Sequence, residues 1–170
     1  MSEQDDGEEL GIWTEAARLI EVTLDEASIG RNNAEVDHER EIAIFDLLEA
    51  NSFALEESEK DGPYTLHLSL VDNRLVLTVG DQNREPITNV SLSLAPFRRI
   101  VKDYFLMCES YYQAIKTQPP SRIEAIDVGR RGLHDEGSRL LMERLRGKIN
   151  VDIATARRLF TLLCALHWKG

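Results

Sequence analysis

The sequence predicts an α+β fold, with an antiparallel meander of three to four strands, one helix before it and three helices after it. Residues 63–94 alternate apolar and polar side chains, which is the period of half-buried strands. Residues 32–49 and 96–168 instead repeat apolar side chains every three to four positions, as amphipathic helices do. Strand and helix segments are therefore segregated along the chain, which is typical of the α+β class.

Length and composition indicate one folded unit. The chain has 170 residues, of which 42% are hydrophobic and 29% charged, and these values are ordinary for a globular domain. Residues 1–16 are acidic and poor in apolar side chains, so we expect a disordered tail there, with Trp13 docking locally. A single α+β domain is predicted to follow over residues 17–170.

The first strand and the first helix are predicted from adjacent segments. Residues 18–24 alternate, and we expect Ile20 on one face with Val22 and Leu24, and Leu19 on the opposite face. Residues 32–49 then form an amphipathic surface helix. We expect Asn32 to cap it, with Glu35 three positions later as in a capping box.

The meander is the clearest local pattern. Residues 63–71 and 74–80 alternate on either side of Asp72-Asn73, a pair that tolerates the positive φ of a two-residue turn. Residues 88–94 give the third strand after a turn at 81–84. The polar face of this sheet either is solvated, as is common, or lines a ligand cleft. Its polar residues are Thr65, His67, Ser69, Thr78, Asn89, Ser91 and Ser93.

Three helices are predicted after the meander. Pro96 opens the first of them, which ends before Pro119 and carries so long an apolar stripe that we expect it to be largely covered. Ser121 and the acid three positions later predict a capping box for the next helix, which Gly147 stops. Asp152 is expected to cap the last helix, which is apolar enough to be buried in the domain or in a partner.

Residues 127–138 are the most unusual segment, because three glycines interrupt a helical pattern and each costs about 1 kcal/mol relative to Ala. One interpretation is close packing, with Gly129 and Gly137 on a face that another helix approaches. A second is a kinked hinge. A third is an anion-binding turn. The candidate ligand-binding residues are then Arg130, Arg131 and His134, with Arg98 and Arg99 as further cations.

The charge is unevenly distributed. The net charge is −10, but residues 1–61 carry 19 acids and 4 Lys/Arg, whereas residues 62–170 carry 11 acids and 16 Lys/Arg. The total argues against nucleic acid and anionic membranes as partners. Spacings of four residues predict helix-surface ion pairs such as Asp127 with Arg131 and Asp135 with Arg139. The remaining arginines are neutralised either within the chain or by an anionic partner.

Signatures of several enzyme classes are absent from the sequence. It has no nucleophile elbow, phosphate loop, dinucleotide fingerprint or zinc-protease motif. Cys108 and Cys164 sit in apolar helical patterns, where buried reduced thiols are expected, and the four histidines fall on separate elements. We expect no metal and no cofactor. No stretch has the ~20 apolar residues of a membrane span, and residues 1–11 do not read as a signal peptide, so a cytoplasmic protein is expected.

Three runs of the sequence are similar to a known family. Residues 18–26 (RLIEVTLDE), 96–104 (PFRRIVKDY) and 129–134 (GRRGLH) resemble an uncharacterised family of small bacterial proteins, chiefly alphaproteobacterial. The resemblance extends over the folded part and implies a bacterial cytoplasmic setting. It implies no mechanism.

The functional expectation is a non-enzymatic binding or regulatory module that acts through protein contacts and self-associates. The alternative is an enzyme or sensor that binds a small phosphorylated or carboxylated metabolite at Arg130, Arg131 and His134. Nucleic-acid binding through the arginine-rich helices is a third hypothesis, which the acidic N-terminal region disfavours.

Overall fold

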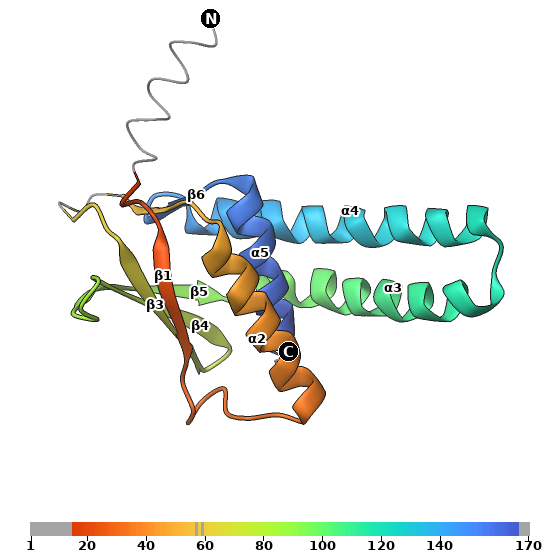
Figure 1. The fold of residues 1–170 in the computed structure, drawn as a ribbon, viewed down its shortest axis with the longest axis horizontal. Helices are drawn as coiled ribbons and strands as arrows, with labels where there is room; N and C mark the ends of the chain where they lie inside the picture. Colours follow the sequence, from red (N-terminus) through yellow and green to blue (C-terminus); the bar gives the residue numbers. More distant parts are fainter. Residues whose placement is uncertain (1–14, 57, 59, 167–170) are drawn as a thin grey trace, which may run out of the picture.

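A computed structural model describes residues 15–56, 58 and 60–166, and its α+β architecture confirms the predicted class (Figure 1). The expectations for residues 1–14, including Trp13, and for His167 and Trp168 lie outside the described residues. No helix in the described part is long and apolar enough to cross a membrane. The elements in chain order are β1 (Leu19–Leu24), α2 (Ala34–Glu49), β2 (Phe53–Leu55), β3 (Tyr64–Val71), β4 (Arg74–Gly80), β5 (Pro86–Ser93), a 3-10 turn (Ala95–Phe97), α3 (Arg98–Thr117), α4 (Pro120–Leu145), β6 (Ile149–Val151) and α5 (Ile153–Ala165).

The main sheet has the strand order β1-β3-β4-β5. Strands β3, β4 and β5 form the predicted antiparallel meander, and Asp72 and Asn73 take φ values of 46° and 61° in the tight turn between β3 and β4. Strand β1 pairs with β3 in the parallel direction, because α2 carries the chain back before β3 begins. The sheet is therefore mixed rather than wholly antiparallel.

The facing of β1 differs from the expectation. Its register against β3 shifts between Leu19 and Glu21, so that Leu19 points into the core beside Val22. Leu19 is 1% exposed and Ile20 is 40% exposed, the reverse of the predicted faces for these two residues. A bulge offsets the alternation by one residue, and strict alternation in a sequence does not reveal it.

A second, two-stranded sheet was not predicted. Strands β2 and β6 pair antiparallel, with Phe53 opposite Val151 and Leu55 opposite Ile149. Each strand has three residues, which is too short for a period-two pattern to be visible. Because β6 directly precedes α5, this pairing fixes the start of the last helix.

Two predicted helix caps are shifted or unformed. The N-cap of α2 is Asn33, whose side chain accepts from the Val36 amide at 2.9 Å, so Asn32 was one residue too early. Helix α4 begins at Pro120, a favoured first position, and Ser121 lies inside the helix instead of capping it. The predicted Ser-x-x-Glu capping box is therefore wrong.

Helix α5 is the centre of the core, and its expected burial is confirmed. Asp152 caps it by accepting from the Thr155 amide at 2.8 Å. At its other end the buried Arg40 of α2 donates through Nε to the Ala165 carbonyl at 2.8 Å and through Nη2 to the Leu166 carbonyl at 3.0 Å. These bonds satisfy carbonyls that the helix end leaves unpaired and join α2 to α5.

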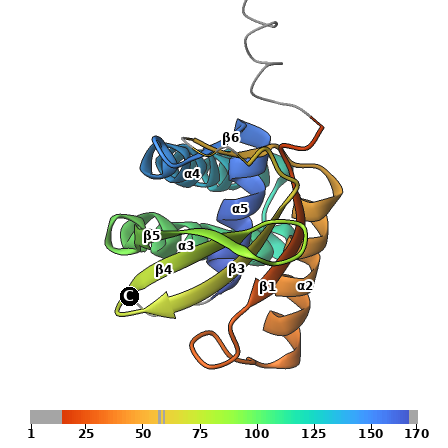
Figure 2. The same ribbon diagram turned by 90° about the vertical axis from the view of Figure 1, so that its left-hand side faces the viewer.

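Helices α3 and α4 run side by side and project away from the sheet (Figure 1), and Figure 2 views this pair from its base. We call the pair the arm. The prediction that α3 is largely covered is wrong: Leu106, Tyr112 and Ile115 are 53%, 63% and 49% exposed. Helix α5 has 13 residues and packs only across the base of the arm. The apolar stripe of α3 extends farther along the arm than α5 does, so its outer part is exposed.

The glycines of α4 lie in one continuous helix, so neither a non-helical turn nor a break is present at residues 127–138. A Cβ on Gly137 would lie 2.2 Å from the Phe160 ring of α5, and one on Gly129 would lie 2.6 Å from the Met107 methyl of α3. Close packing therefore requires glycine at position 137, where the neighbour is a rigid buried ring, and favours it less strongly at position 129, where the neighbour is the end of a flexible side chain. A Cβ on Gly132 would meet nothing within 4 Å, so packing does not explain this glycine.

We predict opposite effects of alanine at two of these glycines. Gly137→Ala drives a methyl group into a fully buried ring and should destabilise the fold by about 1–3 kcal/mol. Gly132→Ala is the matched control and should stabilise it by up to about 1 kcal/mol through helix propensity alone. Urea denaturation followed by circular dichroism measures both. Equal effects at the two positions would contradict the packing at Gly137.

Candidate functional site

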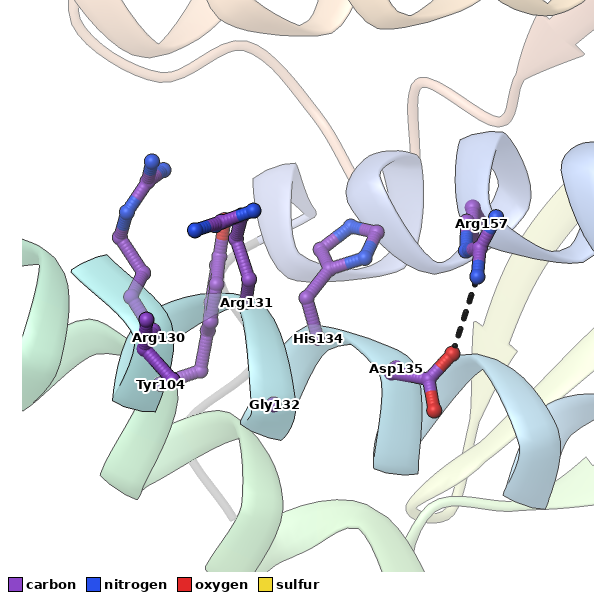
Figure 3. Close-up of a pocket in the computed structure, with 8 residues that line it drawn as sticks. Tyr104, Arg130, Arg131, Gly132, His134, Asp135 and Arg157 are labelled. Atoms are coloured by element: carbon purple, nitrogen blue, oxygen red, sulfur yellow. Dashed lines mark hydrogen bonds and ion pairs between the residues drawn. The ribbon is translucent and has the colours of Figure 1, made fainter.

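A groove at the base of the arm collects the polar residues that the sequence singled out (Figure 3). Its volume is about 760 Å³, within the usual range for sites that hold small molecules. Helix α4 supplies six of its eight lining residues, while α3 and α5 supply one each. We call it the arginine groove, and the residues that line it are Tyr104, Val128, Arg130, Arg131, Gly132, His134, Asp135 and Arg157.

Asp127 holds two of the arginines in place. Its Oδ1 accepts from Arg130 Nη2 at 2.5 Å and Nε at 3.1 Å, and its Oδ2 lies 3.1 Å from Arg131 Nε. The hydrogen bond from Arg130, more than the charge of either arginine, lowers the pKa of Asp127. The Arg130 guanidinium also lies over the Tyr111 ring, with its carbon 4.8 Å from the ring centroid. Asp127 thus anchors the guanidinium groups of Arg130 and Arg131, each by one edge.

Arg157 reaches the groove from α5 and is positioned in the same way. Its Nη2 donates to Asp135 Oδ1 at 3.1 Å, as Figure 3 shows, and the other oxygen of Asp135 accepts from Arg139 Nε at 2.9 Å. Hydrogen bonds from Arg139 and Arg157 lower the pKa of Asp135. Arg157 is half exposed, so this contact orients the guanidinium without removing it from the groove.

His134 is held as a neutral ring. The Thr161 hydroxyl donates to the Arg157 carbonyl at 3.1 Å, which leaves its oxygen to accept from His134 Nε2 at 2.8 Å. Nδ1 is then the unprotonated nitrogen. Burial, followed by the positive charges of Arg157 and Arg130, lowers the pKa of His134. Its ring also packs edge-on against Phe160, with ring centroids 5.2 Å apart.

Tyr104 forms the α3 side of the groove. Its ring lies 5.4 Å from that of His134 and 6.2 Å from that of Phe160, centroid to centroid. Burial raises the pKa of Tyr104, and the neighbouring Cys108 raises it further. The phenol is therefore a neutral hydroxyl group at neutral pH. It lines the groove without adding a charge.

The structure brings together three of the five residues proposed from the sequence. Arg130, Arg131 and His134 all line the groove. Arg99 instead pairs with Asp103 at 3.3 Å and Glu136 at 3.0 Å. Arg98 is exposed at the start of α3, and neither of these two lines the groove.

Sequence reasoning missed Tyr104 and Arg157. Neither was among the candidate ligand-binding residues proposed from the sequence. Both come from helices other than α4: the packing of α3 along α4 brings Tyr104 to the groove, and the packing of α5 across the arm brings Arg157. No spacing in the sequence signals this convergence.

The polar face of the sheet holds a smaller hollow of about 220 Å³. Of the seven residues expected on that face, Thr65, His67 and Thr78 line it. His67 Nδ1 lies 2.7 Å from the Thr23 hydroxyl, and its Nε2 lies 3.7 Å from Asp25. Among the described residues there is no group of three or more His, Cys, Asp and Glu side chains that could hold a metal ion.

Comparison with known proteins identifies relatives along nearly the whole chain. The model of an uncharacterised protein family, UPF0262, matches residues 16–169. A UPF0262 protein of Xanthobacter autotrophicus is 61% identical over 155 residues, which cover 91% of this chain and 94% of that protein. One of Azorhizobium caulinodans is 63% identical over 154 residues, covering 90% and 95%. No solved structure matches. The predicted family resemblance is confirmed, and the names of these relatives state no activity.

We predict that His134 contributes to acid sensitivity of the fold. Because its folded pKa is lower than its unfolded pKa, near 6.5, protonation favours the unfolded chain, and stability is lost as pH falls below about 6.5. His134→Gln should flatten this part of the stability–pH curve, measured by urea denaturation between about pH 5.5 and 7.5. His38→Gln, on the exposed face of α2, is the control and should leave the slope unchanged. An unchanged slope in His134→Gln would count against the buried neutral ring.

Proposed function

We propose that this chain, which belongs to the uncharacterised protein family UPF0262, is a non-enzymatic module that binds a small anionic metabolite in the arginine groove. The observation that carries the proposal is the approach of Arg130, Arg131 and Arg157, from two helices, to one groove. Phosphate and carboxylate groups match the fork of a guanidinium, so the ligand class is a phosphorylated or carboxylated small molecule.

The charge balance of the groove supports an anion. Its lining has three arginines and one aspartate, an excess of two positive charges with His134 neutral. Adding the two residues that form ion pairs with this lining, Asp127 with Arg130 and Arg139 with Asp135, leaves the excess charge unchanged. The local excess stands out because the whole chain carries −10. The described ion pair of Arg131 uses its Nε, and the side chain is 66% exposed, so its terminal nitrogens are accessible to a ligand.

Gly132 supports the same interpretation. It is exposed in the middle of a long helix, where glycine costs about 1 kcal/mol relative to alanine, and no neighbouring atom requires it. It does line the groove, between the two arginines and His134 in the sequence. The absence of a side chain leaves the helix backbone open to a ligand there, which is a reason for the glycine that packing does not supply.

The groups nearest to catalytic ones are already committed to the fold, which favours binding over catalysis. Ser138 lies 3.5 Å from His134 Nδ1, but it is fully buried and donates its proton to the His134 carbonyl at 2.7 Å. His134 Nε2 is engaged with Thr161. The serine therefore lacks the exposure and the free proton that a nucleophile paired with a base needs.

We predict that anion binding depends on the groove arginines. Arg131→Gln and Arg157→Gln should each weaken the affinity for a sugar phosphate at least about tenfold, because each removes a charge-assisted contact. Isothermal titration with inorganic phosphate, a sugar phosphate and a dicarboxylate measures this. Gly132→Ala should also weaken binding while stabilising the fold.

Arg122→Gln is the matched control, since Arg122 is exposed on the same helix and does not line the groove. It should bind as the wild type does. If none of the three anions binds, or if Arg122→Gln weakens binding as much as the groove variants do, the groove is not the site.

A second candidate function is self-association, and exposed apolar side chains on two helices favour it. Phe45 on α2 is 67% exposed and Tyr112 on α3 is 63% exposed. Clusters of large exposed apolar groups are typical of protein interaction surfaces. We predict a particle of twice the chain mass of 19.3 kDa by light scattering at micromolar concentration. A monomer throughout that range would contradict self-association.

A further inference from the structure

The outward face of α2 combines apolar and acidic side chains in a regular row. Residues spaced by four and three positions share one face of a helix, and here each of them is exposed. Ile42, which is 47% exposed, lies in the centre of the row, beside Phe45. We call this surface the acidic row, and its members are Glu35, Glu39, Ile42, Phe45, Asp46 and Glu49.

The outward face of α3 has the complementary composition in the same spacing. Phe105 and Tyr112 are 37% and 63% exposed and lie two turns apart on one side of the arm. Basic side chains flank them at both ends, with one acid, Glu109, between the two rings. We call this surface the basic row, and its members are Arg98, Lys102, Phe105, Glu109, Tyr112 and Lys116.

We infer that the acidic row of one copy of this protein docks on the basic row of a second copy. The inference rests on the proposed self-association and names its interface. The apolar centres of the two rows supply buried area, and the charges around them have opposite signs. A contact between the acidic rows of two copies is disfavoured, because the four acids of one row would face the four acids of the other.

The charges of the two helices identify a second copy as the partner. Helix α2 has six acids and one base, Arg40, which is turned into the core. Helix α3 has four bases and two acids. One chain therefore carries both the acidic row and the basic row, and both surfaces are exposed. A two-fold axis makes the contact twice, which doubles the buried area and closes the assembly as a dimer.

Arg98 belongs to the proposed interface. The sequence proposed it as a ligand-binding residue, and the structure sets it at the base of the basic row, away from the arginine groove. None of the six members of the basic row lines the groove, to which α3 contributes Tyr104. A docked second copy therefore leaves the groove available to a small anion.

Charge exchange between the rows tests the inference. Asp46→Lys with Glu49→Lys makes one variant, and Lys102→Glu with Lys116→Glu makes the other. Each variant alone should dimerise at least about tenfold more weakly than the wild type, because both of its contacts then oppose like charges. An equimolar mixture should regain the dimer, since one contact becomes Lys to Glu and the other is wild type.

Sedimentation velocity measures the three samples, with circular dichroism to establish that each variant is folded. Glu26→Lys with Glu85→Lys, two exposed acids outside both rows, is the charge-matched control and should dimerise as the wild type does. Phe45→Ser and Tyr112→Ser should weaken the dimer without any charge change, which provides a second test where a charge variant fails to fold.

The outcomes are distinct. A mixture that regains the dimer supports the interface. A mixture that stays monomeric with both variants folded overturns it, and so does a dimer that every variant leaves unchanged, although self-association then stands. A wild-type monomer overturns the interface and the proposed self-association together, and it leaves anion binding in the groove unaffected.

Discussion

The close crossing of α4 and α5 at Gly137 is the constraint on which the rest of the architecture depends. The Phe160 ring occupies the space of the missing Cβ, so the two helices approach more closely than any larger residue permits. Helix α5 is thereby set across the base of the arm. Its inner side packs on the leucine-rich face of the sheet, and Arg40 holds its last carbonyls to α2. The same crossing brings Arg157 and Thr161 beside His134, so the groove is a consequence of the core packing.

Ion pairs in the groove act as positioning contacts more than as sources of stability. Exposed pairs contribute at most about 1 kcal/mol each, so the contacts of Asp135 with Arg139 and Arg157 add little to the fold. Their effect is on geometry. The carboxylates of Asp127 and Asp135 each contact one edge of two guanidinium groups and thereby fix how the remaining edges of those groups are oriented. Three of these four arginines line the groove, which keeps its positive excess although every one of them has a partner.

Local patterns in the sequence predicted what is local in the structure. The meander follows from alternation at residues 64–94 and from Asp72-Asn73, whose side chains tolerate positive φ. The bulge in β1 and the three-residue strands β2 and β6 depend on pairing partners distant in the chain, and no short-range period encodes them. The apolar stripe on α3 was predicted correctly, but the prediction that other elements bury most of it was wrong. Periodicity shows which side of a helix is apolar; it does not show how far along that side a neighbouring helix extends. Likewise, the segment at Arg130, Arg131 and His134 was found from its glycines, whereas Arg157 and Tyr104 depended on helix packing.

The three glycines of α4 show how one residue type answers different physical demands in a single helix. Gly137 is required by a buried aromatic ring, and Gly129 accommodates the methyl end of the flexible Met107 side chain. At Gly132 the structure offers no neighbour, so the conformational cost of glycine is offset by nothing within the fold. A helix of 26 residues carries such a cost without unfolding, and stability alone would favour alanine. The proposed anion site supplies a reason for this glycine that packing does not: the open backbone beside the groove arginines is where a bound molecule would contact the helix.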